Sequence, residues 1–307
     1  MLTIWSRLPV IIRAMISGVV VSLVGTLPWP FLVRWNQRVL LTVPWAVLPM
    51  GLYLWLYWKY LNGAGWPRTT AEARRTNLRA NPLSGQVWGL SLLAGLLGLA
   101  ALLPLLRIMS RLVVLPAESK PINVPPAMPF ATVFLLLVMA SIVAGVVEEA
   151  AFRGYMQGPI ERRHGIMVAI LTTGALFGLG HFTHHPGAVL TMLPYYVVVA
   201  AVYGGLAYAT NSILPPLVLH AGGDVLSLTR LLVTGRAEWQ VSASAPPPLI
   251  WNTGLDTAFV RSLIVFAVLG TAALWAYAAL ARAARPANAT SGPAAGPRDS
   301  SAAAHLS

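Results

Sequence analysis

The chain has 307 residues, of which 57% are hydrophobic and only 10% are charged. Its mean hydropathy is +0.69. Roughly a quarter of the residues in an ordinary globular protein are charged, so this composition excludes a soluble globular fold. The net charge is +12, but no basic cluster alternates with aromatic residues on a polar surface, so we expect no nucleic-acid partner. The absence of cysteine excludes disulfides, thiolate metal sites and a cysteine nucleophile.

Apolar runs follow one another along the chain, each near or above the roughly 20 residues that cross a bilayer. About eight such runs occur, centred near residues 18, 50, 97, 140, 174, 199, 222 and 270. We therefore predict an all-α fold: a polytopic membrane protein of about eight transmembrane helices. One transmembrane domain should cover residues 1–285. Residues 286–307 are small, polar and rich in Pro and Gly, so we expect a disordered C-terminal tail.

The basic residues predict the topology. The first apolar run carries Arg13 and is followed by no small-residue cleavage site, so we expect a retained helix rather than a signal peptide. If this helix runs outward, most cationic loops lie inside, and the positive-inside bias places both termini in the cytoplasm. The stretch "RTTAEARRTNLRANP" is then a cytoplasmic loop. We interpret it as a topogenic signal that also contacts anionic headgroups, in preference to a specific protein-binding site.

Three of the nine acidic residues, Glu148, Glu149 and Asp224, lie in or at the edge of apolar segments. A carboxylate at membrane depth is costly unless it is paired, protonated or facing a wet cavity, so its default interpretation is a functional site. The alternative is an ion pair that only packs helices together or reaches the headgroups. On a helix, Glu149 and Arg153 share one face, whereas Glu148 points about 100° away. We expect Arg153 to hold Glu149, and Glu148 to project into a cavity as a general base.

Two later apolar segments add histidines. His181 comes late in one, with Phe177 one turn before it, and His220 and Asp224 lie one turn apart in another. A lone membrane histidine is more often an interhelical hydrogen-bond partner, but a carboxylate with two histidines on separate segments indicates chemistry with water. Imidazoles suit zinc, and a carboxylate can bind metal or deprotonate water. The neighbouring His184 and His185 are assigned to a loop or interface.

The three motifs occur in order on three apolar segments. They are Glu148-Glu149-x-x-x-Arg153, Phe177-x-x-x-His181 and His220-x-x-x-Asp224. Each motif alone is weak, but together they resemble the motif set of the CAAX prenyl endopeptidase and bacteriocin-processing family of intramembrane proteases. The resembling core covers roughly residues 130–230.

This resemblance implies a glutamate-dependent peptidase buried in the membrane near the cytoplasmic side, in a bacterial inner membrane. It implies that Glu148 activates the attacking water and that His181 assists it or binds metal. His220 and the residue one turn later would stabilise the oxyanion or complete a ligand set. By the same resemblance Glu149 and Arg153 support the site, and Phe177 shapes it.

The resemblance also bears on cofactor and substrate. A divalent metal such as Zn²⁺ would be held by Glu148, His181, His220 and Asp224, with a metal-free mechanism as the alternative. Asp224 stands where prenyl endopeptidases usually have Asn; an ionised Asp cannot donate to an oxyanion, but it can bind metal or orient His220. Membrane lipids are expected partners. Candidate substrates are a prenylated CAAX tail, a bacteriocin leader and a membrane-anchored regulator.

Two further expectations concern the helices that carry the site. Glu148 and His181 would meet if the fourth helix continues past Glu149 to about Gln157 and the fifth begins late or tilts. Glycines 174, 178 and 180 would allow close helix approach on the fifth segment.

Two other function classes are a transporter, for which the expected repeated halves are not found, and a non-catalytic scaffold on a protease-like fold. A scaffold would be marked by a lost motif residue, and none is missing.

Overall fold

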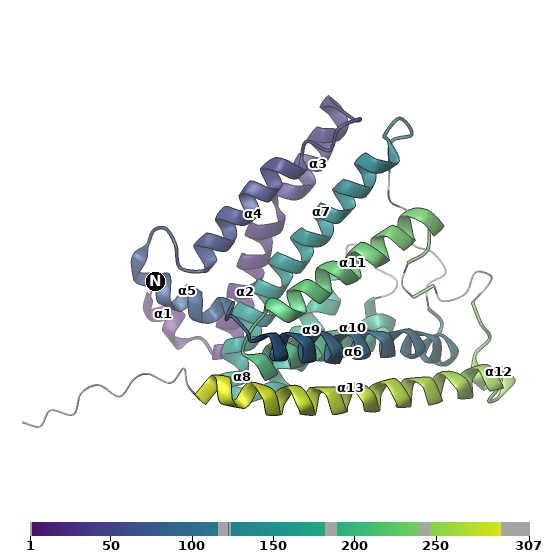
Figure 1. The fold of residues 1–307 in the computed structure, drawn as a ribbon. Coiled ribbons are helices and arrows are strands. Elements are labelled where there is room, and N and C mark those ends of the chain that lie inside the picture. Colours follow the sequence, from purple (N-terminus) through teal and green to yellow (C-terminus); the bar gives the residue numbers. More distant parts are fainter. Residues whose placement is uncertain are drawn as a thin grey trace, which may run out of the picture.

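The computed structural model describes residues 2–115, 122, 124–181, 189–237, 239–240 and 246–289. Within these residues the chain forms helices and no strand, which confirms the predicted all-α class (Figure 1). The helices are α1 Leu2–Arg7, α2 Val10–Thr26, α3 Pro28–Val39, α4 Val47–Leu61, η1 Arg68–Thr70, α5 Ala71–Leu78, α6 Gly85–Leu112, α7 Phe130–Glu148, η2 Glu149–Gln157, α8 Gly158–His164, α9 Ile166–Gly180, α10 Val189–Thr210, α11 Leu214–Thr234, α12 Ile250–Thr253 and α13 Thr257–Ala289.

Among the described residues, six helical stretches are long and apolar enough to cross a membrane. They are Val10–Val39, Gly85–Leu112, Phe130–His164, Val189–Thr210, Leu214–Thr234 and Thr257–Arg285. The predicted runs near residues 50 and 174 form α4 and α9, which have 15 residues each. At 1.5 Å per residue such a helix is about 22 Å long, shorter than the roughly 30 Å hydrocarbon core. The polytopic membrane class is thus confirmed, with two of the eight runs forming short helices.

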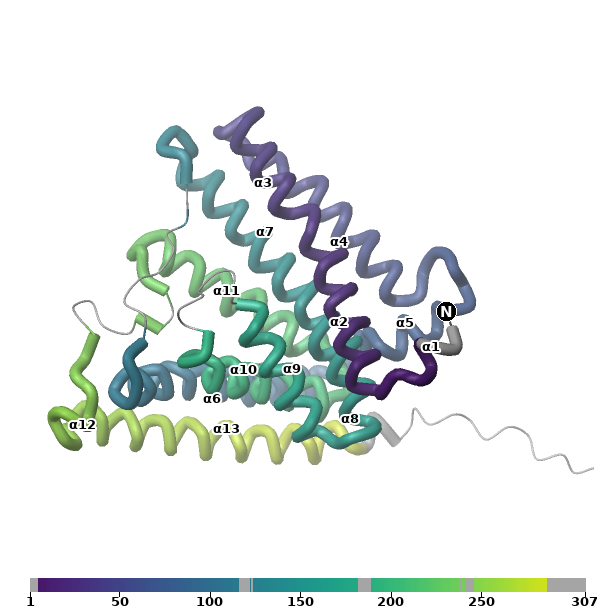
Figure 2. Tube along the Cα trace, turned by 180° about the vertical axis from the view of Figure 1, so that it is seen from behind, coloured from purple at the N-terminus to yellow at the C-terminus, as the bar shows by residue number. Residues whose placement is uncertain are grey.

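The helices form two groups that meet at η2. The helices α6, α10 and α13 lie side by side as one layer, with α9 against α10 (Figure 2). The helices α2, α3, α4 and α7 form a second group that slants away from this layer (Figure 1). Each group has its own apolar core, and α11 lies between them, in contact with α7, α10 and α6. Because η2 contacts α2, α7, α9 and α10, it stands at the junction.

The N-terminal apolar run is part of this packed structure. Ala14 of α2 is buried in a small cluster with Met156 of η2 and Ile160 of α8. The helix α2 therefore supports the same segment that carries the glutamates. This role of the first apolar run was not predicted from the sequence, because the run itself contains no motif.

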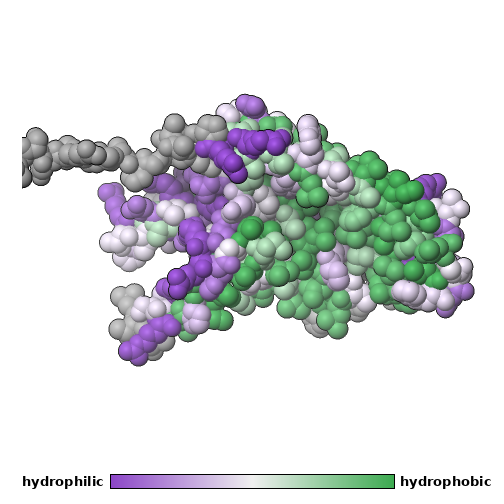
Figure 3. Space-filling view, turned by 90° about the horizontal axis from the view of Figure 1, so that it is seen from below, coloured by the Kyte–Doolittle hydropathy of each residue, from purple (hydrophilic) through white to green (hydrophobic). Residues whose placement is uncertain are grey.

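Hydrophobic side chains cover the middle of the molecule, and hydrophilic ones gather at the end where α1, α5, α8 and the last turns of α13 lie (Figures 1 and 3). The basic residues that these elements carry are Arg7, Arg74, Arg75, Arg162, Arg163, Arg282 and Arg285. One end of the bundle is therefore strongly basic, as the predicted topology requires; its cytoplasmic location stays a prediction. The helix α13 ends at Ala289, beyond the predicted boundary at residue 285, and residues 290–307 lie outside the described part.

Candidate active site

The helix that carries both glutamates runs unbroken from Phe130 to His164. The expectation that it continues past Glu149 to about Gln157 is therefore confirmed. Its middle part, η2, is a nine-residue π-helix, in which backbone hydrogen bonds run from residue i to i+5. Such segments are rare and occur frequently at functional sites. Glu148 is the last residue of α7 and Glu149 the first of η2, so the acid pair stands at the change of helix type.

Glu149, Arg153 and His220 form a buried ionic cluster. The Oε1 atom of Glu149 accepts a hydrogen bond from Nδ1 of His220 at 2.7 Å and lies 3.1 Å from Nη1 of Arg153. The side chains of Glu149 and Arg153 are both 0% exposed. The prediction that Arg153 holds Glu149 is thus confirmed. The sequence did not predict that the same carboxylate orients His220.

Aromatic rings surround this cluster. The Cζ atom of Arg153 lies 5.3 Å from the ring centroid of Phe177 and 5.2 Å from that of Tyr203, within the range of cation–π attraction. The imidazole of His220 stacks on Tyr203 at 5.1 Å with an interplanar angle of 12°. Apolar ring faces therefore take the place of water around the guanidinium, which strengthens its attraction to Glu149.

The second nitrogen of His220 points to the other two acids. Its Nε2 lies 3.8 Å from Oε2 of Glu148 and 3.7 Å from Oδ2 of Asp224. Because Nδ1 donates to Glu149, the ring orientation is fixed with Nε2 towards these carboxylates. The side chains of Glu148 and Asp224 are 27% and 32% exposed, in contrast to the enclosed Glu149. The adjacent glutamates therefore differ in accessibility, as their helical positions predicted.

His181 reaches the site from the end of α9. Its Nδ1–H donates to the backbone carbonyl of Phe177 at 2.8 Å, and its ring stacks on Tyr196 with a centroid distance of 4.3 Å. The ring of Phe177 lies 4.8 Å from that of His181 and 6.2 Å from that of His220. Phe177 thus stands between the two imidazoles, and the structure brings all three sequence motifs together around it.

Close helix contacts set these positions. At Gly145, one turn before Glu148, an added Cβ would lie 2.8 Å from Cβ of Ala221, next to His220. The absence of a side chain there lets α7 and α11 approach closely enough to join Glu149 with His220. On α9, a Cβ at Gly178 would lie 2.7 Å from Leu193, and one at Gly174 would lie 3.0 Å from the backbone of α10. The predicted close approach is confirmed at these two glycines, while Gly180 faces open space.

The predicted metal ligands can be tested against this geometry. Imidazole and carboxylate donors do gather at Nε2 of His220, which is suitable ligand chemistry for Zn²⁺. Among the described residues, however, no group of three or more His, Cys, Asp or Glu is arranged to hold a metal ion. The ligand set Glu148, His181, His220 and Asp224 therefore does not fit a metal site as these side chains stand. His184 and His185 lie outside the described residues.

Tyr196 and Tyr203 are the site residues that the sequence analysis missed. Tyr196 stacks on His181 and Tyr203 stacks on His220. Both are on α10, seven residues apart and hence on the same helical face. Tyrosine in membrane helices concentrates at the interfaces, so two tyrosines within the apolar run of α10 were a usable signal.

Comparison with known proteins supports the recognised resemblance. A family model described as type II CAAX prenyl endopeptidase Rce1-like matches residues 130–226. The matched segment extends from α7 into α11 and contains all seven candidate site residues. The resemblance to the CAAX prenyl endopeptidase and bacteriocin-processing family is thereby confirmed over this segment, and that family is one of proteases. No curated protein and no solved structure matches the chain.

Proposed function

We propose that this protein is an intramembrane endopeptidase in which Glu148 activates a water molecule for attack on a peptide bond. One observation carries the proposal. Within apolar helices, the partly exposed carboxylates of Glu148 and Asp224 flank Nε2 of His220, while the enclosed Glu149 is held by Arg153 and His220. So costly a group of charges within apolar helices indicates a function rather than packing alone.

Glu148 is the best candidate for the general base. Its carboxylate is partly exposed and makes no hydrogen bond within the described residues, so it can accept a proton from water. The resulting hydroxide attacks the carbonyl carbon of the peptide bond. His220 donates from Nε2 to the oxyanion that forms, and Glu149 compensates the positive charge that remains on the ring. Glu148 then returns its proton to the leaving amine as the carbon–nitrogen bond breaks.

The other motif residues have positioning roles in this proposal. Arg153 fixes Glu149, and Phe177 separates and orients the two imidazoles. His181 assists Glu148 or the incoming peptide from the opposite side of Phe177. No step is assigned to a metal ion, because the side chains do not form a ligand group.

The substrate is proposed to be a membrane-associated protein or peptide, of the CAAX-type prenylated or leader-peptide class. The family match and the apolar surroundings of the site support this class. A prenyl chain would partition into the bilayer and bring the adjacent peptide to membrane depth.

The test is cleavage of prenylated and leader peptides by the purified full chain in liposomes, with and without a chelator. Glu148→Gln should lower the rate by at least about a hundredfold, the scale of general-base catalysis, without loss of folded protein. Glu72→Gln, which removes an exposed glutamate on α5, is the matched control and should retain full activity. Full activity of Glu148→Gln would contradict the proposal. A folded native chain that cleaves no peptide of the panel would favour the scaffold instead.

A further inference from the structure

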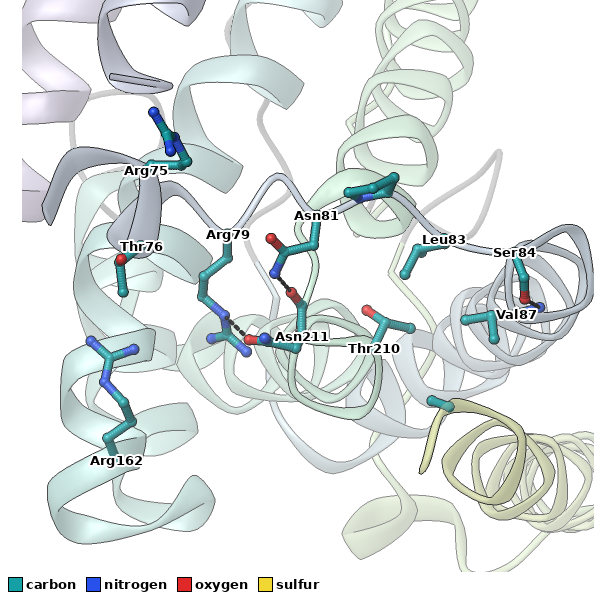
Figure 4. Close-up of a pocket in the computed structure, with 12 residues that line it drawn as sticks. Arg75, Thr76, Arg79, Asn81, Leu83, Ser84, Val87, Arg162, Thr210 and Asn211 are labelled. Atoms are coloured by element: carbon teal, nitrogen blue, oxygen red, sulfur yellow. Dashed lines mark hydrogen bonds between the residues drawn. The ribbon is translucent and has the colours of Figure 1, made fainter. Parts of the chain in front are cut away.

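A cavity of about 600 Å³ opens at the basic end of the molecule, and none of the seven candidate site residues lines it (Figure 4). Its walls come from α5, α8, the turn between α10 and α11, the first turn of α6 and the end of α13. Arg75, Arg79 and Arg162 line it, and no acidic residue does. A cavity of this size can hold a small-molecule headgroup.

Arg79 forms a fixed part of the wall. Its guanidinium is buried, pairs with Glu161 at 2.9 Å and donates to the carbonyl of Ala207 and to Oδ1 of Asn211. Asn81 donates to the backbone carbonyl of Asn211, which ties the turn to the loop before α6 (Figure 4). The cavity is therefore held by a hydrogen-bonded frame whose own arginine is already compensated.

The other two arginines have no such compensation. Both are exposed, and the guanidinium of Arg75 makes no hydrogen bond or ion pair with any described residue. Arg162 donates only to Oδ1 of Asn77, at 3.5 Å. Two arginines without a carboxylate partner therefore line the cavity, and the guanidinium of Arg75 turns towards Gly63 at its rim (Figure 4). Guanidinium groups bind phosphate with paired N–H donors, so the missing partner should be a phosphate-like anion.

The first turn of α6 adds positive potential and an apolar wall. Ser84 is the N-cap of α6, and its Oγ accepts from the backbone N–H of Val87. The remaining N–H groups of a first helical turn favour a nearby anion. Leu83, Val87 and Ala284 line the same cavity with apolar side chains. A free inorganic anion would gain nothing from such a wall, but the glycerol and upper acyl carbons of a lipid would.

We propose that this cavity binds the headgroup of an anionic phospholipid. The phosphate pairs with Arg162 and with Arg75, whose exposed guanidinium turns in from Gly63 on binding, and the chains leave along Leu83, Val87 and Ala284. The site lies at the polar end of the spanning helices α6, α10 and α13, where bilayer headgroups are found. Basic pockets between membrane helices are suited to such headgroups. The proposal is independent of the peptidase, and its test does not measure cleavage.

The test measures binding of short-chain phosphatidylglycerol, phosphatidylcholine and inorganic phosphate to the full chain in detergent. The native protein should bind phosphatidylglycerol more tightly than either other probe. Arg75→Gln with Arg162→Gln should weaken phosphatidylglycerol binding about tenfold or more, since each cation near a headgroup contributes on the order of 1 kcal/mol. The matched control is Arg68→Gln with Arg163→Gln, which removes two exposed charges at the same end but outside the cavity. Its affinity should change less than about twofold.

A second pair of variants keeps both arginines. Thr76 is an exposed residue that lines the cavity, so Thr76→Glu adds an anion there, while Thr76→Gln adds similar bulk without charge. Only Thr76→Glu should lose phosphatidylglycerol binding. Equal losses in the cavity and control doubles would overturn the proposal in favour of general surface attraction. Equal binding of phosphatidylcholine, or equally tight binding of inorganic phosphate, would overturn the assignment to an anionic lipid.

Discussion

Two buried arginines meet at the π-helical segment η2, Arg153 within it and Arg79 against its backbone, and they are held in different ways. Arg79 has a carboxylate, a carbonyl and an amide oxygen as partners, and its Nη1 also reaches the backbone carbonyl of Arg153 at 3.4 Å. Arg153 has one carboxylate oxygen of Glu149 at 3.1 Å and aromatic rings around it. None of its three guanidinium nitrogens makes a well-aligned hydrogen bond with the described residues.

This contrast separates a structural arginine from a functional one. A buried polar atom without a hydrogen bond costs about 1–3 kcal/mol, and native proteins retain such atoms mainly at sites with a special role. The donors of Arg79 are used to join α5, α8 and α10. The charge of Arg153 is instead left in an aromatic enclosure, where it acts on Glu149 and through it on His220. We therefore expect the two arginines to respond differently to removal.

The largest effect should come from Arg153→Met. Glu149 would keep its charge at 0% exposure without its cation, and breaking a buried pair in this way costs about 3–5 kcal/mol. The melting temperature in detergent and the cleavage rate should both fall.

The double variant Arg153→Met with Glu149→Gln is the control for that interpretation. It removes both charges, so most of the lost stability should return, while cleavage stays low because His220 loses its carboxylate. An unchanged melting temperature in the single variant would contradict the pairing.

Arg79→Met should destabilise by less, about 1–3 kcal/mol, because the Glu161 carboxylate that it leaves is 9% exposed and keeps a hydrogen bond from Gln157, whereas Glu149 is fully enclosed. The rate per folded molecule should stay at the native level, since no reacting group contacts Arg79. The melting temperature and the cleavage rate are both measured for Arg79→Met and for Arg153→Met. A rate loss in Arg79→Met as large as in Arg153→Met would erase the distinction.

The ionic residues were predictable from the sequence because charges are rare in apolar runs, and the i, i+4 spacing was sufficient to pair Glu149 with Arg153. The contact between Glu149 and His220 was not predictable, since it depends on the approach of α7 and α11 at Gly145 and on a π-helix. Neither the close approach of these two helices nor the π-helix produces a periodic pattern of residue types in the sequence. Hydropathy also overestimated the length of α4, because the mostly apolar residues 40–46 precede the start of that helix at Val47.

The cavity was missed for a related reason. Arg75 and Arg79 were assigned to a topogenic loop, and Arg162, about 85 residues away in the sequence, had no predicted relation to them. The three come together because the chain returns to the basic end after the long helix from Phe130 to His164. Their clustering is a property of helix lengths and directions, and local sequence patterns do not report it.

The next prediction tests whether the acids around His220 act as charges. Asp224→Asn keeps the volume but removes the carboxylate that lies 3.7 Å from Nε2 of His220. If this charge stabilises the imidazolium of His220, the rate should fall by about ten- to a hundredfold. Rate and bound metal are measured on the same samples. Activity that is retained or increased would show that Asn can replace Asp224 as a hydrogen-bond donor.

The aromatic enclosure is tested by Phe177→Leu. This change removes the ring beside Arg153 and between the two imidazoles, which should cost about 0.5–2 kcal/mol of stability and lower the rate moderately. Phe130→Leu is the matched control, because its ring is exposed on α7 and contacts none of these groups. Equal melting temperatures for the two variants would mean that the rings contribute only apolar surface.

The smallest effect is expected at an ion pair whose carboxylate is exposed, which gives the reference for Arg79 and Arg153. Asp256 precedes α13, and its Oδ1 accepts from the backbone N–H of Phe259 while its Oδ2 accepts from Nη1 of Arg111. These hydrogen bonds, that of the backbone first, hold the pKa of Asp256 below its ordinary value.

A carboxyl with a lowered pKa contributes stability above its unfolded pKa, and this contribution is lost as the pH falls through the folded value. Asp256→Asn should therefore be slightly less stable than the native chain at neutral pH. The difference should shrink below about pH 4, where the unfolded carboxyl is protonated. Melting temperatures of both proteins across this range test the prediction. If the difference between them did not depend on pH, the loss would come from poorer packing of the amide and not from the missing charge.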